Sequence, residues 1–294
     1  MKCFIIGKNS NLSRQLSNFI KNTTLVSLSK AEDIDKILKY KKKFNLIFNN
    51  FYPMRLINSL DIKNLDSFYE KSLLQNIQLI KRINYKYVNK IIYTSSSSIY
   101  NSLDVHENDN DKFNRKIYSS VKLSNEKLIL NISERKKICC HILRIFNIYG
   151  GRHDKFSIIF KINDCIKKNK KFTLFNKGTS IRDFIHVEDI CKIYEKILIS
   201  KKKINKILDL GTGTGFRIAD IVNCSGIKKK DIIISNKYVD EISASVADMR
   251  WLKKFFPDFK FESLIKNIKF QKRSKIKIYK YKDLKKPINQ IFKN

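Results

Sequence analysis

The chain has 294 residues, of which 43% are hydrophobic and 12% aromatic, so it is long and apolar enough to bury a core and is not a disordered polypeptide. Its net charge of +34 would attract nucleic acid, an anionic membrane or phosphorylated small molecules. Lysines occur along the whole chain, which also fits a general compositional bias, so charge alone does not choose among these partners. The densest basic run is the tail, residues 271–294.

The six cysteines form neither a CxxC pair nor a Cys/His set at zinc-ligand spacing, which predicts reduced thiols and no metal site. The apolar run at the amino terminus is too short for a signal sequence. No stretch approaches the roughly 20 apolar residues of a membrane-spanning helix. From these features we expect a cytoplasmic protein.

Short apolar runs rich in Ile, Leu and Phe alternate along the chain with segments whose apolar residues recur at helical spacing. The predicted strands cover residues 2–6, 24–28, 45–49, 90–95, 141–146 and 206–210. The predicted helices cover residues 10–20, 34–42, 68–83 and 119–137. This alternation predicts an α/β fold with a parallel sheet covered on both faces. Such sheets bind ligands beyond the carboxyl ends of their strands.

The first predicted strand ends at Gly7 and is followed by Ser10 and Ser13. A dinucleotide-binding turn normally has three glycines there, so that the backbone can approach a pyrophosphate at the start of the helix. Serine is the smallest substitute with a side chain, and its hydroxyl can donate to phosphate. The turn alone is a weak indication of a dinucleotide site.

The end of the second predicted strand bears on the choice between NAD and NADP. An acid is expected there in a chain that binds the 2′-hydroxyl of NAD, whereas Ser27, Ser29 and Lys30 occupy this place. A hydroxyl followed by a cation suits a 2′-phosphate, which favours NADP(H) over NAD(H). The alternative is that Lys30 is one more solvated lysine.

The fourth predicted strand runs into four consecutive serines, residues 95–98, which form either a solvated turn or a substrate-facing segment. Tyr118 and Lys122 are four residues apart and therefore share a face of the following helix. An ammonium group beside the phenol would lower the pKa of Tyr118 from about 10 towards neutrality, which suits a general acid or base. A tyrosine on an amphipathic helix is otherwise a packing residue.

The glycines of DLGTGTGF, residues 209–216, resemble a phosphate-binding loop when viewed alone. No further strand–helix pattern follows them, so we interpret this segment as a turn into a second lobe.

Seven segments, in order, make the chain similar to the extended short-chain dehydrogenase/reductases, in the NAD-dependent epimerase/dehydratase family that acts mainly on nucleotide sugars. They are IIGKNSNLSRQL (5–16), IIYTSSSSIYN (91–101), YSSVK (118–122), LRIFNIYGGR (143–152), RDFIHVEDI (182–190), LDLGTGTGF (208–216) and SVADMRWLKKFFPDF (245–259). The resemblance covers nearly the whole chain and implies a Rossmann-type doubly wound parallel sheet with a smaller α/β substrate-binding lobe. The dinucleotide-binding domain would comprise residues 1–148 with a return segment at 183–212, and the lobe 149–182 and 213–294.

The resemblance also implies the site. A catalytic Ser or Thr stands three residues before the Val/Ile of the family's VYG motif, so Ser96 would act with Tyr118 and Lys122. Tyr118 would move a proton on a sugar hydroxyl or ketone, Ser96 would bond the same oxygen, and Lys122 would hold the nicotinamide ribose. The implied cofactor-binding residues are Gly7, Ser10, Asn11, Leu12, Ser29, Lys30, Asn49, Asn50, Phe51, Tyr118, Lys122 and Ile145. The implied substrate-binding residues are Ser97, Ser98, Asn147 and Arg182.

We therefore expect an NAD(P)-dependent sugar-nucleotide oxidoreductase, either a 4-keto-sugar reductase or an epimerase, and a homodimer as is usual in the family. Ser97 and Ser98 occupy the positions of the Asp-Glu pair of 4,6-dehydratases, which disfavours that reaction. The short chain and the Ser29-Lys30 pair favour a reductase. The lost glycines, together with Phe51 where the family has a small residue, leave open a non-catalytic relative that binds RNA or another polyanion.

Overall fold

The computed structural model describes residues 1–52, 62–101, 113–151, 157–201, 206–237, 239, 242–267 and 276–285. The chain forms two compact units, Met1–Arg144 with Cys191–Leu208 and Ile145–Ile190 with Asp209–Asn294. The boundaries proposed from the sequence, after residues 148, 182 and 212, differ by four, eight and four residues from these crossing points. None of the helices within the described residues is long and apolar enough to cross a membrane.

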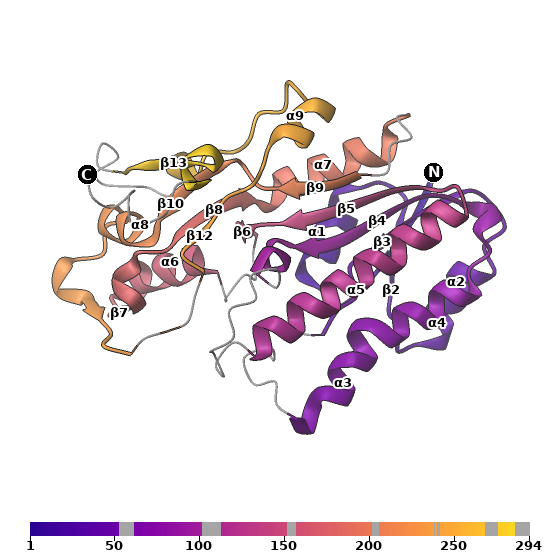
Figure 1. Ribbon diagram of the computed structural model, residues 1–294, viewed down its shortest axis with the longest axis horizontal. Helices are drawn as coiled ribbons and strands as arrows, with labels where there is room; N and C mark the ends of the chain where they lie inside the picture. The colour runs from indigo at the N-terminus through magenta and orange to yellow at the C-terminus, as the bar shows by residue number, and fades with distance from the viewer. Residues whose placement is uncertain are drawn as a thin grey trace. The chain divides into compact units, whose positions relative to one another are not determined.

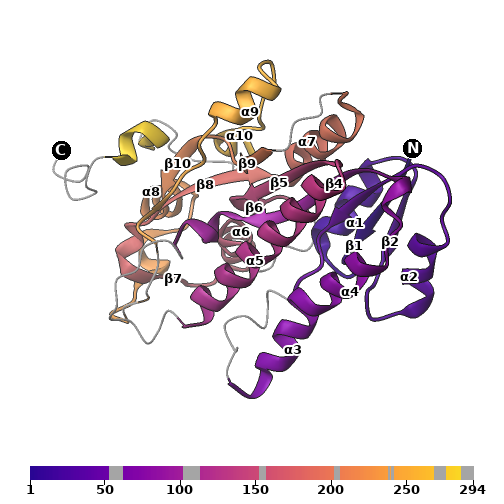
Figure 2. The same ribbon diagram turned by 45° about the vertical axis from the view of Figure 1, so that its right-hand side comes forward.

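The first unit is built on a six-stranded sheet in the order β2-β1-β3-β4-β5-β9, drawn in Figures 1 and 2. Its strands are β1 (Lys2–Ile6), β2 (Thr23–Val26), β3 (Phe44–Phe48), β4 (Val88–Ser96), β5 (Cys139–Ile145) and β9 (Lys206–Leu210). β1 pairs in parallel with both β2 and β3, and β3 pairs in parallel with β4. The chain runs outward from β1 to β2 and then returns to β3 on the other side. A topological switch point therefore lies between β1 and β3, where doubly wound sheets bind ligands.

The helices of this unit are α1 (Asn11–Phe19), α2 (Ala31–Leu38), α3 (Leu65–Tyr69), α4 (Gln75–Arg82), α5 (Phe113–Arg135) and α7 (Val187–Ile199). The helix expected at 68–83 is in fact three segments, because the π-helical turn η3 (Glu70–Leu74) separates α3 from α4. Two 3₁₀ turns, η4 (Tyr85–Tyr87) and η5 (Ser97–Asn101), flank β4. The four serines thus run from the end of β4 into η5.

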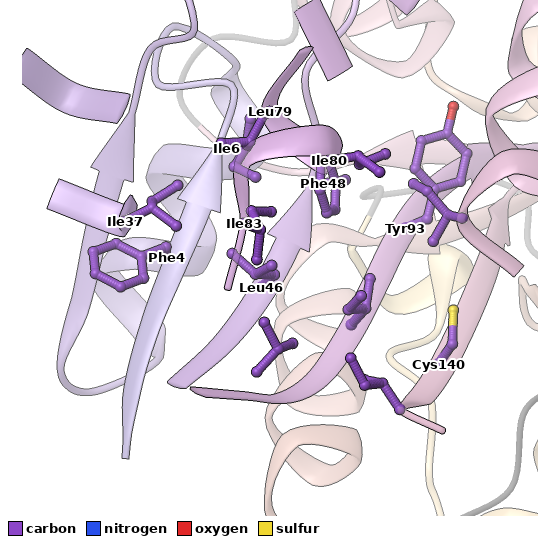
Figure 3. Packing of buried hydrophobic residues seen from close by; sticks show 14 of the residues in the cluster. Phe4, Ile6, Ile37, Leu46, Phe48, Leu79, Ile80, Ile83, Tyr93 and Cys140 are labelled. Atoms are coloured by element: carbon purple, nitrogen blue, oxygen red, sulfur yellow. The ribbon is translucent and has the colours of Figure 1, made fainter. Parts of the chain in front are cut away.

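The core of the first unit forms between the sheet and the helices on one face. Figure 3 shows Leu79, Ile80 and Ile83, from α4 and the residue after it, beside the apolar side chains of the strands. Ile129 of α5 belongs to the same cluster. In Figures 1 and 2, α4 and α5 run along this face of the sheet. Such burial of apolar surface is the main stabilising contribution to the unit.

The opposite face of β4 contacts α7. The Thr94 and Tyr194 hydroxyl oxygens lie 2.8 Å apart, and Lys90 donates to the carbonyl oxygens of Ile197 and Ser200 at 2.5 and 2.8 Å. Lys90 and Thr94 alternate with the core residues Ile91 and Tyr93, as side chains of a strand do. Lys90 therefore satisfies the last carbonyl groups of α7, which have no partner within the helix.

The second unit has a five-stranded sheet in the order β12-β8-β10-β13, in which β6 also pairs with β8. Its strands are β6 (Asn147–Tyr149), β8 (Ile181–His186), β10 (Thr214–Arg217), β12 (Ala244–Ser245) and β13 (Ile278–Lys280); β7 (Phe172–Leu174) and β11 (Ile232–Ile234) form a separate parallel pair. Its helices are α6 (Ile158–Lys168), α8 (Ile218–Cys224), α9 (Arg250–Phe255) and α10 (Leu264–Asn267). Buried side chains of α6, α8, β7 and β8 form its core.

Candidate active site

The turn between β1 and α1 lies at the switch point of the sheet. Gly7 has a φ of +107°, which side chains rarely adopt, and a Cβ built on it would lie 2.5 Å from the carbonyl oxygen of Asn49. The backbone N–H groups of Gly7 and Lys8 donate to the carbonyl oxygen of Val26 at 2.9 and 3.1 Å. Only glycine fits this position, because the end of β3 approaches the turn so closely.

Ser10 and Ser13 stand where two further glycines are typical, and a single side chain joins them. Ser10 is the N-cap of α1, and its hydroxyl oxygen accepts from the backbone N–H of Ser13 at 3.5 Å. The side-chain amide of Asn49 donates to the Ser10 hydroxyl at 2.9 Å and to the Ser13 hydroxyl at 2.7 Å. Asn49 therefore fastens the end of β3 to the start of α1. Ser10 is the acceptor in both of its bonds, so its hydroxyl can still donate to a phosphate.

The first turn of α1 has the features of an anion site. Asn11 and Leu12 begin the helix, and the first backbone N–H groups of a helix have no partner within it. These groups and the helix dipole favour negative charge at this point. Together with the close approach at Gly7, the turn fits the pyrophosphate of a dinucleotide.

The residues that follow β2 make hydrogen bonds with one another that the sequence does not reveal. The hydroxyl groups of Ser27 and Ser29 are 2.9 Å apart, and Lys30 is exposed at the start of α2. The carboxylate of Asp33, which sequence reasoning missed, is buried and accepts from the backbone N–H of Ser27 at 3.1 Å. An acid in the first turn of the next helix was the available signal. Burial alone would raise the pKa of Asp33, but bonds from Lys36 and Ser27, with the nearby charges of Lys36 and Lys8, lower it.

Ser96 and Tyr118 meet at the carboxyl end of β4. Ser96 is the last residue of that strand, and its side chain lies close enough to Tyr118 of α5 to act on the pKa of the phenol. The hydroxyl oxygen of Ser96 also accepts from the backbone N–H and the hydroxyl of Ser98, at 3.2 and 3.0 Å. Ser119 donates to the carbonyl oxygen of Ser98 at 3.0 Å and so holds η5 against α5. Ser97 and Ser98 are half-buried beside this pair.

Lys122 is buried one helical turn beyond Tyr118. Its Nζ donates to the carbonyl oxygen of Thr94 at 2.9 Å. The same atom lies 4.2 Å from the ring centroid of Phe51, 5.3 Å from that of Tyr93 and 6.0 Å from that of Tyr118. The ammonium group is thus closest to an aromatic face that attracts cations. Its nearest ring belongs to Phe51 rather than to Tyr118.

The expectation that Lys122 lowers the pKa of Tyr118 towards neutrality is wrong for this arrangement. Burial raises the pKa of Tyr118 to about 12, against a smaller lowering by the Ser96 hydrogen bond. Burial also lowers the pKa of Lys122 to about 7, which the negative charge of Glu126 only partly opposes. In both groups desolvation disfavours the charged form and is the largest cause of the shift. At neutral pH Tyr118 is therefore a protonated acid.

Exchanging Lys122 for methionine is expected to remove a pH dependence of stability. Between the folded pKa of about 7 and the unfolded value of 10.5, the unfolded chain binds a proton that the folded chain does not. The contribution of Lys122 to the free energy of unfolding therefore rises with pH across this window and is least favourable below it. The Lys122→Met variant should melt several degrees higher near pH 6.

The control for this prediction is Lys127→Met, which removes an exposed amine from the same helix. Melting temperatures of the three proteins measured between about pH 6 and pH 10 give the difference curves. A Lys122→Met difference that stays constant over this range would contradict the desolvation of Lys122.

Phe51 lies within the same group of side chains. Its ring centroid is 5.0 Å from that of Tyr118 and 5.8 Å from that of Phe68, edge to face in both pairs. The preceding residue, Asn50, donates to the carbonyl oxygen of Lys71 at 2.7 Å. Phe51 thus fills space beside both Tyr118 and Lys122, where the resemblance implies a small residue.

A buried ion pair beneath the site was not expected from the sequence. Nε and Nη2 of Arg144 donate to the two carboxylate oxygens of Glu126 at 3.0 and 2.8 Å. The Glu126 side chain is 1% exposed, and the Arg144 guanidinium lies 4.8 Å from the ring centroid of Tyr100. Burial works against the charge on Arg144, but the bonds to Glu126 and Tyr100 raise its pKa further. This bidentate pair joins α5 to β5.

The predicted substrate residues Asn147 and Arg182 lie on the adjacent parallel strands β6 and β8 of the second unit. Asn147 donates to the carbonyl oxygen of Asp183 at 2.9 Å, and Arg182 donates to that of Ile181 at 2.9 Å. Both side chains are half-buried. Ile145, predicted as a cofactor contact, is buried at the end of β5.

The glycine-rich segment after β9 holds an internal carboxylate. The backbone N–H groups of Thr212 and Gly213 donate to the carboxylate of Asp183 at 2.9 and 2.8 Å, and that of Ala247 donates at 3.1 Å. Burial raises the pKa of Asp183 even though these donors oppose the shift. The amides that would cradle a phosphate are therefore already bound, and this segment connects β9 to β10 as a turn.

Two features noted in the sequence remain, the basic tail and the predicted lack of a metal site. The basic tail is described only at residues 276–285. Among the residues that the structure covers, no group of His, Cys, Asp and Glu could hold a metal ion.

The doubly wound sheet with a glycine turn at its switch point defines a Rossmann-type nucleotide-binding fold. The family model of the NAD dependent epimerase/dehydratase family matches residues 8–211. Because this match spans more than half of the chain, the protein belongs to the NAD-dependent epimerase/dehydratase family. The resemblance noted in the sequence and the predicted fold class are both confirmed.

Curated relatives and solved structures agree with this membership. A dTDP-D-glucose 4,6-dehydratase of Dictyostelium discoideum is 26% identical over 242 residues, covering 78% of this chain and 51% of the relative. Protein CapI of Staphylococcus aureus is 24% identical over 84% of this chain and 80% of its own length. The chain thus spans about half the length of the first relative. A UDP-glucuronic acid 4-epimerase of Bacillus cereus, solved with UDP-glucuronic acid and NAD, has the same fold (TM-score 0.73, 19% identity, 92% and 97% coverage).

Proposed function

We propose that this chain is a nicotinamide-dinucleotide-dependent oxidoreductase that reduces a keto group of a nucleotide-linked sugar, with Tyr118 as the proton donor. The observation that carries the proposal is the placement of Ser96, Tyr118 and Lys122 together at the carboxyl end of β4, where Lys122 donates to the carbonyl oxygen of Thr94 at 2.9 Å. In the same unit, the Gly7 turn fits a dinucleotide pyrophosphate. Curated relatives in this family include a nucleotide-sugar dehydratase, and a solved neighbour is a complex with a nucleotide sugar and NAD.

The roles follow from the contacts. The Gly7 turn and the first turn of α1 would hold the pyrophosphate, and Lys122 the nicotinamide ribose. When bound, the dinucleotide supplies the hydride that the sugar carbon accepts. Ser96 would donate a hydrogen bond to the keto oxygen, and Tyr118 would transfer its phenolic proton to that oxygen as it becomes a hydroxyl. Positioning of such groups accounts for much of the rate enhancement in reactions of this kind.

Two features support reduction over the alternatives. Tyr118 is protonated at neutral pH, which is the form a ketone reduction needs, whereas an epimerase must also remove a proton from a hydroxyl. Ser97 and Ser98 lack the carboxyl groups that an elimination of water would use as acid and base. Asn147 and Arg182 are proposed to contact the phosphates of the sugar nucleotide. The relatives give no support to a non-catalytic RNA-binding protein.

We propose a nicotinamide dinucleotide without choosing between NAD(H) and NADP(H), which differ in the 2′ group of the ribose. Ser29 and Lys30 are the argument for NADP(H), since the described end of β2 presents hydroxyl groups and a cation there. The solved neighbour is a complex with NAD and does not support an NADP(H) preference. Asp33 is buried and bonded to Ser27 and Lys36, so it is not presented to a ribose hydroxyl in this arrangement.

The first test is mass spectrometry of small molecules released by denaturing the freshly purified protein, followed by titration with NADH and NADPH. We expect no retained dinucleotide, micromolar binding on titration, and oxidation of the bound reductant on addition of a dTDP- or UDP-linked 4-keto sugar. Stoichiometric retained NAD would instead indicate an epimerase and overturn the proposed reduction. Binding of neither dinucleotide would overturn the proposed function as a whole.

A further inference from the structure

The ring of Phe51 occupies a position that the proposed function requires for another group. It lies 4.2 Å from the Nζ of Lys122 and 5.0 Å, centroid to centroid, from the ring of Tyr118. These two side chains are the ones proposed to contact the nicotinamide end of the dinucleotide. Phe51 lies three residues after the end of β3, close to the switch point, and is only half-buried.

The hydrogen-bonding capacity of Lys122 shows what the ring covers. An ammonium group has three N–H donors. One donates to the carbonyl oxygen of Thr94 at 2.9 Å, which fixes the direction of the side chain. The face of Phe51 at 4.2 Å and the ring of Tyr93 at 5.3 Å lie against the same ammonium group. Of these rings that of Phe51 lies nearest to Nζ, so a ribose hydroxyl that accepts from Lys122 on this side would take the place of the Phe51 ring.

The neighbours of Phe51 provide a surface beside this position. Its ring packs edge to face on Phe68 at 5.8 Å, and Phe68 in turn contacts Tyr52 and Tyr69 at 5.4 and 5.6 Å. Phe68 and Tyr52 are buried, so this aromatic cluster is a fixed wall of the first unit.

We propose that Phe51 is an internal competitor for the nicotinamide riboside end of the dinucleotide: its ring covers Lys122 and Tyr118 and leaves them when the dinucleotide binds. This inference rests on the proposed function. Phe51 thereby lowers the affinity for the dinucleotide, because the ring must separate from Lys122 each time that a dinucleotide binds.

The first measurement is the affinity for NADH and NADPH of the wild type, Phe51→Ala, Phe51→Leu and Tyr69→Ala. Phe51→Ala should bind about tenfold more tightly, since the contact with Lys122 no longer has to be broken. Phe51→Leu retains bulk but has no π face, so its affinity should fall between the two. Tyr69→Ala removes an exposed ring of the same aromatic cluster that contacts Phe68, and it should match the wild type. Unchanged or weaker binding by Phe51→Ala would overturn the proposal.

The second measurement does not depend on dinucleotide binding. Reductive methylation with formaldehyde, mapped by mass spectrometry, reports how accessible each lysine is, with exposed Lys127 as the internal reference. Lys122 should react at least several-fold faster in Phe51→Ala than in the wild type, and Tyr69→Ala should show the wild-type rate. Equal Lys122 rates in Phe51→Ala and the wild type would overturn the covering role.

The two measurements distinguish a failure of the proposed function from a failure of the proposed competition by Phe51. If neither the wild type nor Phe51→Ala binds a dinucleotide, the proposed function fails and the competition fails with it, whatever the methylation shows. If both bind equally well, the proposed function stands and the competition alone is wrong. Should Phe51→Ala not fold, Phe51→Leu gives the same comparison, with tighter binding than the wild type expected and equal binding contradicting it.

Discussion

Replacing Tyr118 with phenylalanine is expected to lower turnover by about 10²- to 10⁴-fold while leaving dinucleotide affinity close to that of the wild type. The change removes only the phenolic hydroxyl, which is the proposed proton donor and the partner of Ser96. The ring keeps its edge-to-face contact with Phe51, so packing around α5 is preserved. The measurement is single-turnover oxidation of bound NAD(P)H by a 4-keto sugar nucleotide, with cofactor affinity measured on the same preparations.

Tyr69→Phe is the matched control, because it removes an exposed hydroxyl from a tyrosine of the same aromatic cluster. Its turnover should equal that of the wild type. Full activity in Tyr118→Phe would remove Tyr118 from the proposed mechanism. A loss of cofactor binding in that variant would show that the hydroxyl acts in binding rather than in proton transfer.

Replacing Arg144 with methionine is expected to destabilise the protein by about 3 to 5 kcal/mol. The change leaves the carboxylate of Glu126 buried, at 1% exposure, without the two charge-assisted bonds at 2.8 and 3.0 Å. An uncompensated buried charge is far more costly than the loss of an ordinary hydrogen bond. The measurement is the urea concentration at the midpoint of unfolding of the first unit.

Two further variants show whether the cost comes from the stranded carboxylate. Adding Glu126→Leu to Arg144→Met removes the buried charge, and most of the lost stability should return because an apolar pair of similar volume can replace a buried ion pair. Asp35→Asn breaks the exposed pair between Asp35 and Lys39 and should leave the midpoint unchanged. A double variant that is no more stable than Arg144→Met would contradict this explanation.

Local patterns in the sequence were sufficient for the elements that position the site. The runs that became β1, β3, β4 and β5 are continuous and apolar because both faces of the sheet are covered, and such runs are recognisable without coordinates. Helical spacing identified α1 and most of α5, and it placed the helix that became α2 (Ala31–Leu38) too late in the chain, at 34–42. The prediction of a single helix at 68–83 was only partly correct, because the π-helical turn η3 interrupts it. Such a turn depends on side-chain packing, which the spacing of apolar residues does not reveal.

The chemistry of the site depended more on contacts between distant segments. The loss of two glycines at Ser10 and Ser13 reads as a damaged turn in the sequence, yet Asn49, 39 and 36 residues away, bonds both hydroxyl groups. Likewise, DLGTGTGF has the composition of a phosphate loop, but its amide groups are bonded to Asp183 from another strand. Composition cannot distinguish these cases, because the partner of each polar group comes from elsewhere in the chain.

By itself, the sequence determined the fold class through local periodicity. Its short motifs, through their resemblance to a known family, determined the family and the strand and helix from which Ser96, Tyr118 and Lys122 come. Only the tertiary structure decided how those side chains ionise and what covers them. The spacing of Tyr118 and Lys122 predicted a lowered tyrosine pKa, whereas burial raises it to about 12. Desolvation depends on every atom that surrounds a group, including the ring of Phe51 beside Lys122, and that information exists only once the chain has folded.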